Sequence, residues 1–295
     1  RRPLVSIIAP SLNTGRFLRD TLDSIFRQSY EPIEVIVVDG GSTDETLGIL
    51  KQYSQVRWVS EKDAGIVEAV WKGFHMSQGE YFSYVCVSDG FLDRKWLRSC
   101  VDVLEKDPEV SAVWSVHQEL SEDGHLGRVA WPEYLGRHAP PQKADFLAFW
   151  LACRHDFEIT AVYRRNVFED CYPRNSPDEK YRTAPSYALN YNFNTRGYLP
   201  FFLPYIGFFA RTHAMQYQER NYELLDTLVK LYDREWEAYR KDLFSGRVTH
   251  RFRNGRSEII GEMTPEDVSR CKKQCRRYRL KYKLRRYFEK FLDHL

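Results

Sequence analysis

The chain has 295 residues, a formal net charge of +3 at pH 7, and a composition that is 43% hydrophobic and 29% charged. This length allows one large domain with an appendage, or two domains. No apolar run approaches the ~20 residues that a bilayer-spanning helix needs, which excludes an ordinary membrane-spanning protein. We therefore expect a cytoplasmic protein, or one that is peripheral to the inner face of the plasma membrane.

The six cysteines are scattered along the chain, and Cys86 falls within a predicted core strand, so we interpret all of them as reduced thiols. Cys271 and Cys275 lie four residues apart on one predicted helix face, but no second pair completes a zinc site. The chain starts at Arg1 without a methionine, which suggests a fragment of a longer protein or a trimmed chain.

The N-terminal part of the chain alternates between strand patterns and helix patterns. Runs of β-branched residues indicate buried strands, and apolar residues at three- and four-residue spacings indicate the intervening helices. A series of this kind predicts an α/β fold with a mostly parallel sheet, flanked by helices and joined by right-handed crossovers. In chain order, the expected strands are Val5–Ala9, Ile33–Val38, Val56–Val59 and Tyr81–Val87, and the expected helices cover residues 17–26, 45–53 and 66–76.

The later part of the chain is predicted to be mainly helical. A long helix is expected over residues 217–244, whereas residues 247–264 stay ambiguous. Thr264-Pro265-Glu266-Asp267 then begins a last helix with a cap, a proline and two acids. We therefore divide the chain into an α/β domain, residues 1–215, and a helical C-terminal extension, residues 216–295.

Two of the predicted strands end in an acidic residue. Asp39 follows an apolar strand, and Gly40 and Gly41 behind it allow a sharp turn into the next helix. Asp89 follows the fourth strand, with Gly90 directly after it. Open α/β sheets bind ligands at the carboxyl ends of their strands, so the two acids predict a nucleotide site at this edge. Neither a dinucleotide glycine pattern nor a Walker sequence is present.

Several short motifs occur in an order and spacing that resemble family 2 glycosyltransferases, which have the GT-A fold. The resemblance covers about Leu4 to His213. Several ordered motifs are much harder to obtain by chance than one, so the resemblance implies a GT-A sheet. It rests on Pro10-Ser11-Leu12-Asn13, Val38-Asp39-Gly40-Gly41-Ser42-Thr43-Asp44, Ser60-Glu61-Lys62-Asp63-Ala64-Gly65, Lys72-Gly73, Gly79-Glu80-Tyr81, Ser88-Asp89 and Ile159-Thr160-Ala161-Val162-Tyr163-Arg164-Arg165-Asn166-Val167-Phe168.

The resemblance implies a nucleotide-binding role for residues at the ends of the first three strands. Pro10, Ser11 and Asn13 would lie beside the nucleotide. Asp39 would hydrogen-bond the base or the ribose, and Asp63 would lie near both. The alternative for Asp39 is more ordinary, namely an acid that caps a turn between a strand and a helix.

The resemblance also implies a divalent cation, Mg²⁺ or Mn²⁺, that bridges the diphosphate of the donor. Ser88 and Asp89 occupy the motif that holds the ribose and the cation. The cation is needed because a leaving diphosphate develops negative charge. His213 matches a position from which a histidine can approach the diphosphate or the metal. The alternative is a histidine at a strand end whose hydrogen bonds are satisfied within the protein.

The chain departs from the family pattern at three positions where the family commonly has acids. Gly90 stands in place of a second metal-binding acid, and Asn190 and Asn192 stand in place of an Asp-Tyr-Asp group that includes the catalytic base. An amide cannot accept a proton at neutral pH, so the base is missing at its family position. Glu158 is our preferred replacement, and otherwise it is a solvated loop acid. For His155, a structural role as a hydrogen-bonding histidine is more common than a role as the base.

The C-terminal segment, residues 270–295, carries eleven Lys or Arg residues and two acids, a net charge of +9 that leaves the rest of the chain at −6. Interleaved aromatic and leucine residues make it a predicted basic amphipathic helix. Such a helix suits an anionic membrane surface, or a neighbouring domain or protomer. A nucleic-acid interface is the weakest interpretation, because no recognition fold accompanies the helix and the body is acidic. We therefore expect no nucleic-acid partner.

Two classes of function remain open. The resemblance implies an inverting glycosyltransferase that moves a sugar from a nucleotide-diphosphate donor to a saccharide or lipid-linked acceptor in bacterial-type polysaccharide synthesis. The alternative is a weak or inactive relative that serves as a scaffold or nucleotide-binding module in a larger protein. Asp39, Asp63 and Asp89 favour a nucleotide pocket, whereas Gly90 and the amides at the base position argue against ordinary chemistry.

Overall fold

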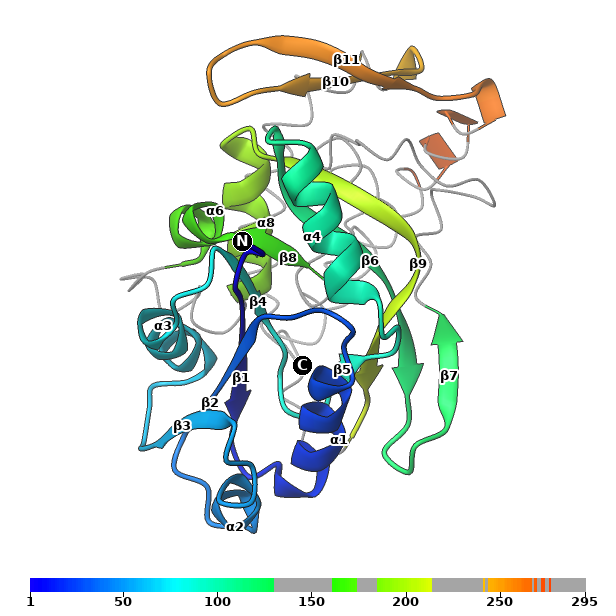
Figure 1. Cartoon of the computed structure of the whole chain (residues 1–295). Helices are drawn as coiled ribbons and strands as arrows, with labels where there is room; N and C mark the ends of the chain where they lie inside the picture. The colour runs from blue at the N-terminus through cyan, green and yellow to red at the C-terminus, as the bar shows by residue number, and fades with distance from the viewer. Residues whose placement is uncertain are drawn as a thin grey trace, which may run out of the picture.

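The computed structural model describes residues 1–129, 161–173, 185–213, 241, 244–266, 268–269, 272–273 and 276. A large mixed sheet forms the body of this part of the chain (Figure 1). Its strands are β1 (Val5–Ser11), β2 (Ile33–Asp39), β3 (Val56–Ser60), β4 (Tyr81–Tyr84), β5 (Gly90–Phe91), β6 (Val110–Leu120), β7 (Leu126–Val129), β8 (Val162–Arg164) and β9 (Leu199–Arg211). They are arranged in the order β3-β2-β1-β4-β8-β6-β9-β5, and β7 pairs with β6.

The first four strands are parallel, as the alternation of strands and helices predicts. Their register aligns the strand ends, because Ser11 of β1 lies opposite Asp39 of β2, and Asp39 lies opposite Ser60 of β3. The later strands are mixed: β8 is antiparallel to both β4 and β6, whereas β9 is parallel to β6 and antiparallel to β5. The predicted α/β class is therefore confirmed, and the parallel ends form one edge.

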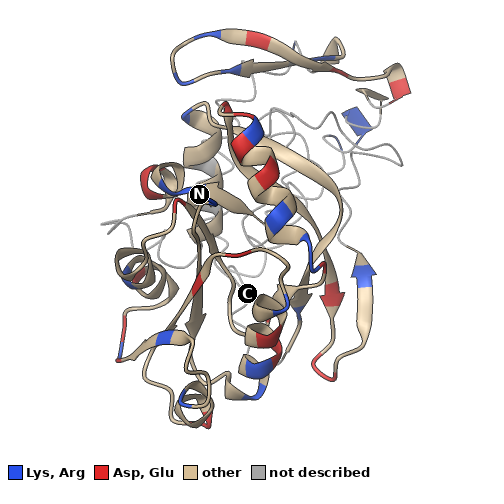
Figure 2. Ribbon diagram, in the orientation of Figure 1, with Lys and Arg blue, Asp and Glu red and all other residues tan. Residues whose placement is uncertain are grey.

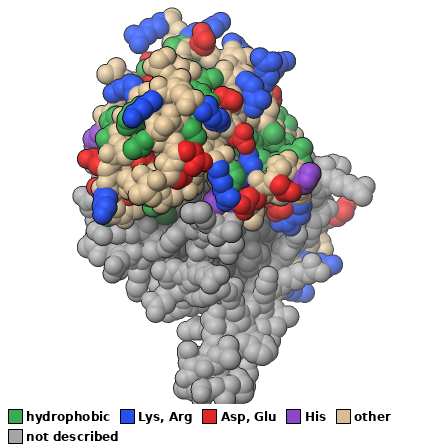
Figure 3. Space-filling view, turned by 90° about the horizontal axis from the view of Figure 1, so that it is seen from below, with side chains coloured by type: hydrophobic (Ala, Val, Ile, Leu, Met, Phe, Trp, Pro, Cys, Tyr) green, Lys and Arg blue, Asp and Glu red, His purple; other side chains and the backbone are tan. Residues whose placement is uncertain are grey.

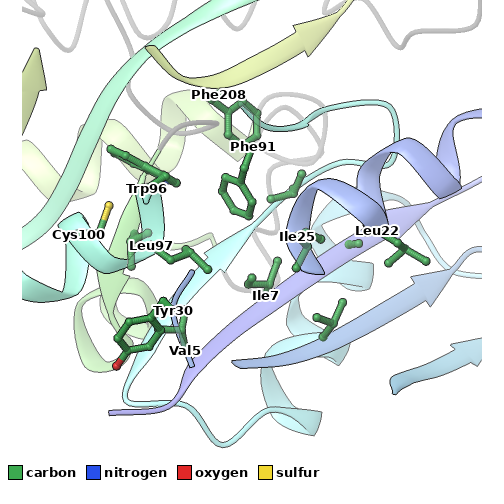
Figure 4. Close-up of a cluster of buried hydrophobic side chains, with 14 of the residues drawn as sticks. Val5, Ile7, Leu22, Ile25, Tyr30, Phe91, Trp96, Leu97, Cys100 and Phe208 are labelled. Carbon is green, nitrogen blue, oxygen red and sulfur yellow. The ribbon is translucent and has the colours of Figure 1, made fainter. Parts of the chain in front are cut away.

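Six helices of the described chain cover the two faces of the sheet. Alternate residues of each central strand point to opposite faces. On one face, α1 and α4 pack over a cluster that includes Ile7, Leu22 and Trp96 (Figure 4). On the other face, α3, α6 and α8 pack over a second cluster that includes Ile8 and Phe168. The helix bounds are α1 (Gly15–Phe26), α2 (Thr46–Leu50), α3 (Ile66–Met76), α4 (Trp96–Lys106), α6 (Arg165–Cys171) and α8 (Pro185–Thr195).

The fourth strand is shorter than the sequence pattern predicts. It ends at Tyr84, and the chain then passes through Val87 to a turn at Ser88 before it enters the two-residue strand β5. Val87 N–H still donates to the carbonyl of Pro10 over 3.1 Å, which ties this connection to the end of β1. The Ser88–Asp89 motif is therefore held beside the parallel edge.

The described part of the C-terminal extension contains a β-hairpin, β10 (Arg247–Arg251) and β11 (Ser257–Glu262), in a segment whose pattern was ambiguous. Our description of the extension as helical was therefore incomplete. The hairpin contacts the body of the protein, because His250 Nε2 lies 3.2 Å from the carbonyl of Gly197 and Arg253 forms an ion pair of 2.8 Å with Asp170. Charged residues of both signs are spread over α1, α4 and the hairpin (Figure 2).

None of the described helices combines the length and the hydrophobicity that are required to cross a bilayer. Most of the predicted basic segment, residues 270–295, and the expected helix over 217–244 lie outside the described residues. Both expectations stay predictions.

Candidate active site

Hydrogen bonds join the loops that follow β1 and β2 at the parallel edge. Gly40 N–H donates to the carbonyl of Ser11 over 2.9 Å. Asn13 N–H donates to Ser42 Oγ over 2.7 Å, and Thr43 N–H donates back to Asn13 Oδ1 over 2.9 Å. The predicted nucleotide residues Ser11, Asn13 and Asp39 are therefore brought together, and Pro10, which precedes Ser11, is buried. Seen from below, the molecule carries acidic, basic and histidine side chains close together on its coloured surface (Figure 3).

Asp39 is fully buried, and its carboxylate is used within the protein. Oδ2 accepts hydrogen bonds from Gly41 N–H at 3.2 Å, Ser42 N–H at 2.9 Å and Ser60 Oγ at 2.6 Å. Oδ1 accepts a further, short hydrogen bond from Ser42 Oγ. Oδ2 thus has three donors and Oδ1 has one, so most of the acceptor capacity of this carboxylate is used within the protein. The geometry therefore supports a role for Asp39 in holding the turn after β2.

Asp63 lies at the same edge and keeps acceptor capacity. Its Oδ1 accepts a hydrogen bond from Gly65 N–H at 2.9 Å, and Oδ2 accepts none among the described residues. The half-buried carboxylate stands close to Gly40, because a Cβ on that glycine would lie 3.3 Å from Asp63 Oδ2. The same Cβ would lie 3.4 Å from the exposed side chain of Leu12. A hydrogen-bond acceptor, Asp63 Oδ2, and an apolar side chain, Leu12, thus lie next to Gly40, whose backbone carries no side chain.

Asp89 is buried beside the last strand of the large sheet. Its exposed fraction is 7%, and Oδ1 accepts a hydrogen bond of 2.9 Å from the backbone N–H of Arg211. Burial raises the pKa of Asp89 to about 7, although the Arg211 N–H, the Ser88 hydroxyl and the Arg211 charge each oppose the rise. Asp89 is therefore a carboxyl group that changes its charge near neutral pH.

Arg211 is a residue of this site that sequence reasoning missed. It is 4% exposed, and its guanidinium donates to the carbonyls of Ser88 and Glu122, each over 3.2 Å, and to Asp20 Oδ2 over 2.7 Å. The guanidinium carbon also lies 4.7 Å from the centre of the Phe17 ring. A signal was present in the sequence, because Arg211 is a lone charge at the end of the otherwise uncharged strand Leu199–Arg211.

His213 lies two residues further on and packs on the same aromatic ring, with 4.9 Å between its ring centre and that of Phe17. The ring is buried, and Nδ1 has no hydrogen-bond partner within the described structure. Desolvation and the positive charges of Arg16 and Arg211 lower the pKa of His213, against a smaller opposing effect of Glu122. A neutral imidazole with an unpartnered nitrogen is able to bind a cation.

The residues present fit a cation only if it arrives with other ligands. The described part of the chain contains no cluster of three or more His, Cys, Asp or Glu side chains that would hold a metal ion. Asp89 and His213 both adjoin Arg211, and they offer one carboxylate and one imidazole. The oxygen ligands that Mg²⁺ or Mn²⁺ requires beyond these would come from a bound diphosphate and from water.

An acid at Gly90 would require neighbouring side chains to move in this chain. A Cβ at this position would lie 2.3 Å from Ser24 Oγ and 2.7 Å from a ring carbon of Phe209. Gly90 pairs with Phe209 in the sheet, so any side chain on it would enter the packed interface with α1. The absence of an acid at Gly90 is therefore a packing requirement of this chain.

The amides on α8 are also packed within the protein. Asn190 is fully buried, its Nδ2 donates to the carbonyl of Ser186 over 2.9 Å, and its Oδ1 has no partner in the described residues. Asn192 is half-buried and donates to the carbonyl of Cys171 over 2.8 Å. The burial of Asn190 separates it from solvent, whereas Asn192 is partly exposed, and Glu158 lies outside the described residues.

A comparison with protein-family models matches residues 6–172 to "Glycosyl transferase family 2", which is more than half of the chain. Among curated proteins, the chain is similar to a chondroitin synthase of Escherichia coli, with 31% identity over 140 residues, covering 45% of this chain and 20% of that protein. It is also similar to a hyaluronan synthase of Pasteurella multocida, with 30% identity over 140 residues, covering 45% of this chain and 14% of that one. The chain thus spans a small part of these relatives.

Solved structures show the same fold at low sequence identity. S. aureus TarS 1–349 in complex with UDP-GlcNAc matches with a TM-score of 0.56 and 16% identity, covering 82% of this chain and 75% of that chain. The mannosyltransferase PcManGT from Pyrobaculum calidifontis, in complex with GDP-Man and Mn²⁺, matches with a TM-score of 0.54 and 21% identity, covering 74% and 59% respectively. Together with the family match, these structures confirm the GT-A fold that the motifs predict. The chain belongs to glycosyl transferase family 2.

Proposed function

We propose that the protein transfers a sugar from a nucleoside-diphosphate donor, with inversion at the anomeric carbon, to a saccharide or lipid-linked acceptor during polysaccharide synthesis. The observation that carries the proposal is the division of the parallel edge into two parts on either side of the end of β1. Asp63 keeps an acceptor without a partner among the described residues on one side. On the other side, Asp89 is bonded to Arg211, and Arg211 and His213 pack on the same Phe17 ring. The first part suits a nucleoside, and the second suits a diphosphate.

The reaction would be a direct displacement at the anomeric carbon. The bond from that carbon to the diphosphate oxygen breaks, a bond to the acceptor oxygen forms, and the hydroxyl proton passes to a base. Asp89 and His213 would hold a divalent cation, which when bound neutralises charge on the leaving diphosphate. Glu158 is the proposed base, because Asn190 is buried and cannot accept a proton.

The nature of the donor is suggested by relatives. TarS has been solved with UDP and with UDP-GlcNAc, and PcManGT has been solved with GDP-Man and Mn²⁺. The relatives named chondroitin synthase and hyaluronan synthase support a saccharide acceptor. We further propose that residues 270–295 attach the protein to an anionic membrane surface, which would place it near a lipid-linked acceptor.

A second candidate function is a nucleotide-binding scaffold without turnover. Two observations favour it: a side chain at Gly90 would collide with Ser24 and Phe209, and Asn190 is buried in α8. In this case the protein would bind the donor and hold it, or would hold a neighbouring domain, in a larger assembly.

A calorimetric titration with UDP and GDP, each with and without Mn²⁺, tests both candidates. Binding that Mn²⁺ strengthens, followed by release of UDP or GDP from UDP-GlcNAc or GDP-Man, is the result expected for the transferase. Binding without release over a long incubation with saccharide acceptors supports the scaffold. If neither nucleotide binds under any of these conditions, both candidates are wrong.

A further inference from the structure

Helix α1 carries two hydroxyl groups that are buried against the Ser88–Phe91 turn. Thr21 is fully buried and Ser24 is 1% exposed. Thr21 Oγ1 donates to the carbonyl of Asp89 over 2.7 Å and accepts a hydrogen bond of 3.2 Å from Ser88 N–H. The Thr21 hydroxyl thus pairs with the backbone N–H of Ser88 and the backbone carbonyl of Asp89. Asp89 is the acid of the proposed cation site.

The turn needs such support because its backbone is strained. Ser88 has a φ of 131°, a value that residues with a side chain rarely adopt without support from their surroundings. Within the turn, Asp89 N–H donates to the carbonyl of Cys86 over 3.0 Å, and Phe91 N–H donates to Ser24 Oγ over 3.1 Å. Arg211 binds the Ser88 carbonyl and the Asp89 carboxylate from β9. Thr21 is the side chain that binds the backbone on both sides of the Ser88–Asp89 peptide group.

Loss of this hydroxyl would leave two buried backbone groups without partners. An unpaired buried donor or acceptor is unfavourable, so the turn would rotate toward an ordinary φ at Ser88 to reach new partners. Arg211 would still hold the Ser88 carbonyl and the Asp89 carboxylate. The remaining oxygen of Asp89 would nevertheless shift, because it follows the backbone of the turn.

We propose that Thr21 is a positioning residue, which holds Asp89 in the orientation that a cation–diphosphate group requires. This inference rests on the proposed nucleotide site. It assigns a role to a side chain of α1 that lies beneath the site and contacts no ligand. This role requires the hydroxyl group of Thr21. Thr21→Ser should therefore preserve the orientation of Asp89, and Thr21→Val should not.

The first experiment measures hydrogen exchange of the free protein, with no nucleotide or metal added. Thr21→Val and Thr21→Ala both remove the hydroxyl, and the second does so without placing a new methyl group against the turn. Each should speed exchange in residues 86–91 by about tenfold or more, and Thr21→Ser should stay near wild type. The control is Ser83→Ala, which removes an equally buried bond of 2.9 Å from Ser83 Oγ to the carbonyl of Ala161.

The second experiment titrates the same variants with UDP in the presence of increasing Mn²⁺. The two hydroxyl-free variants should need at least about fivefold more Mn²⁺ for half-maximal binding, while Ser83→Ala and Thr21→Ser keep the wild-type midpoint. Unchanged exchange and an unchanged midpoint in the hydroxyl-free variants would overturn the inference. A wild-type protein that binds no nucleotide would overturn the proposed function, and the exchange experiment would still decide whether Thr21 holds the turn.

Discussion

Asp39 and Asp63 lie at the same edge of the sheet, but their surroundings differ at the scale of single residues. Asp39 has four donors around its carboxylate and is fully buried, whereas Asp63 leaves Oδ2 without a partner among the described residues. Asp63 is therefore the better candidate for direct nucleotide contact. Substitution of Asp39 would act mainly through the stability of the turn, because several buried donors would lose their acceptor.

Asp63→Asn should weaken nucleotide binding by about 1–3 kcal/mol, because the side chain loses its charge and one acceptor while its shape is kept. Isothermal titration with UDP and GDP measures the change. The control is Asp102→Asn, which alters an exposed acid on α4. Equal affinities of wild type and Asp63→Asn for both nucleotides would assign the contact to another residue.

The raised pKa of Asp89 predicts a pH dependence that differs from that of an ordinary acid. Its folded-state pKa of about 7 lies above the usual value of 3.8, so the folded state binds the proton more tightly than the unfolded state does. The contribution of Asp89 to the free energy of unfolding is thus fully present below about pH 4, and it is lost as the pH rises from about 4 to about 7. Asp89→Asn, which keeps an acceptor for Arg211 N–H, should remove this loss.

Thermal unfolding of both proteins at a series of pH values checks the prediction. The melting temperature of Asp89→Asn relative to wild type should be higher at pH 8 than at pH 4.5. In the same range, Mn²⁺-dependent UDP binding by wild type should weaken as the pH falls below about 7, because the carboxylate becomes protonated. A melting difference that does not vary with pH would contradict the assigned pKa.

At the scale of secondary-structure elements, α8 and the hairpin were the parts that sequence patterns described least well. The amides of α8 stand at the positions of a family motif that has acids there, and the helix turns Asn190 into the protein. The β10–β11 hairpin packs on the turn between α8 and β9, where Gly197 has a φ of 75° and Tyr198, Arg196 and Arg253 surround Asp170. The β10–β11 hairpin thus contributes to the stability of the body.

Asn190→Asp should lower the free energy of unfolding at pH 7 by about 2 kcal/mol or more and should not raise activity. A carboxyl group at this position would be buried, and the Ser186 carbonyl would lose its amide donor. Chemical denaturation and a transfer assay measure the two effects, with Asn192→Asp, at a half-buried position, as the comparison. A stable and more active Asn190→Asp protein would restore the interpretation of Asn190 as a lost base.

Gly197→Ala should destabilise the protein by about 2 kcal/mol more than Gly255→Ala does. Both glycines have a positive φ, of 75° and 82°, so the backbone strain is similar. A Cβ on Gly197 would lie 2.4 Å from the carbonyl oxygen of Arg251, whereas a Cβ on Gly255 would have no neighbour within 4 Å. Equal unfolding free energies of the two variants would mean that the hairpin does not pack on this turn in solution.

At the scale of the whole molecule, the uneven charge of the chain predicts where it meets a surface. Deletion of residues 270–295 should abolish sedimentation with vesicles that contain anionic lipid and should leave nucleotide binding unchanged, because it removes a net charge of +9. Binding of the full chain to these vesicles should also weaken as the salt concentration rises, since salt screens the attraction and the Debye length is already only about 8 Å at physiological ionic strength. Neutral vesicles are the control. An unfolded truncated protein would instead place the segment in the core or in a domain interface.

Much of the fold could be read from the sequence because its local patterns are strong. The β-branched run before Asp39 and the helical spacing of Phe17, Leu18 and Leu22 specify a strand and a helix independently of the rest of the chain. The βαβ series then brings the strand ends to one edge, since parallel strands with helical crossovers have no other arrangement. The positions of Asp39, Asp63 and Asp89 at that edge follow from these patterns.

The state of each side chain was decided only by the tertiary structure, because burial and hydrogen bonding depend on contacts between residues far apart in the chain. The donors from Gly41 and Ser42 to Asp39 are local, but no local pattern indicates that Ser60 also donates to it. Nor does any local pattern indicate that Phe209 closes the space at Gly90, or that the lone charge of Arg211 bonds to Ser88 and Asp20. The sequence by itself determined the α/β class, the family and the edge at which a nucleotide would bind. The tertiary structure decided how much acceptor capacity each acid at that edge keeps, because every hydrogen bond that a carboxylate accepts within the protein leaves less for a ligand.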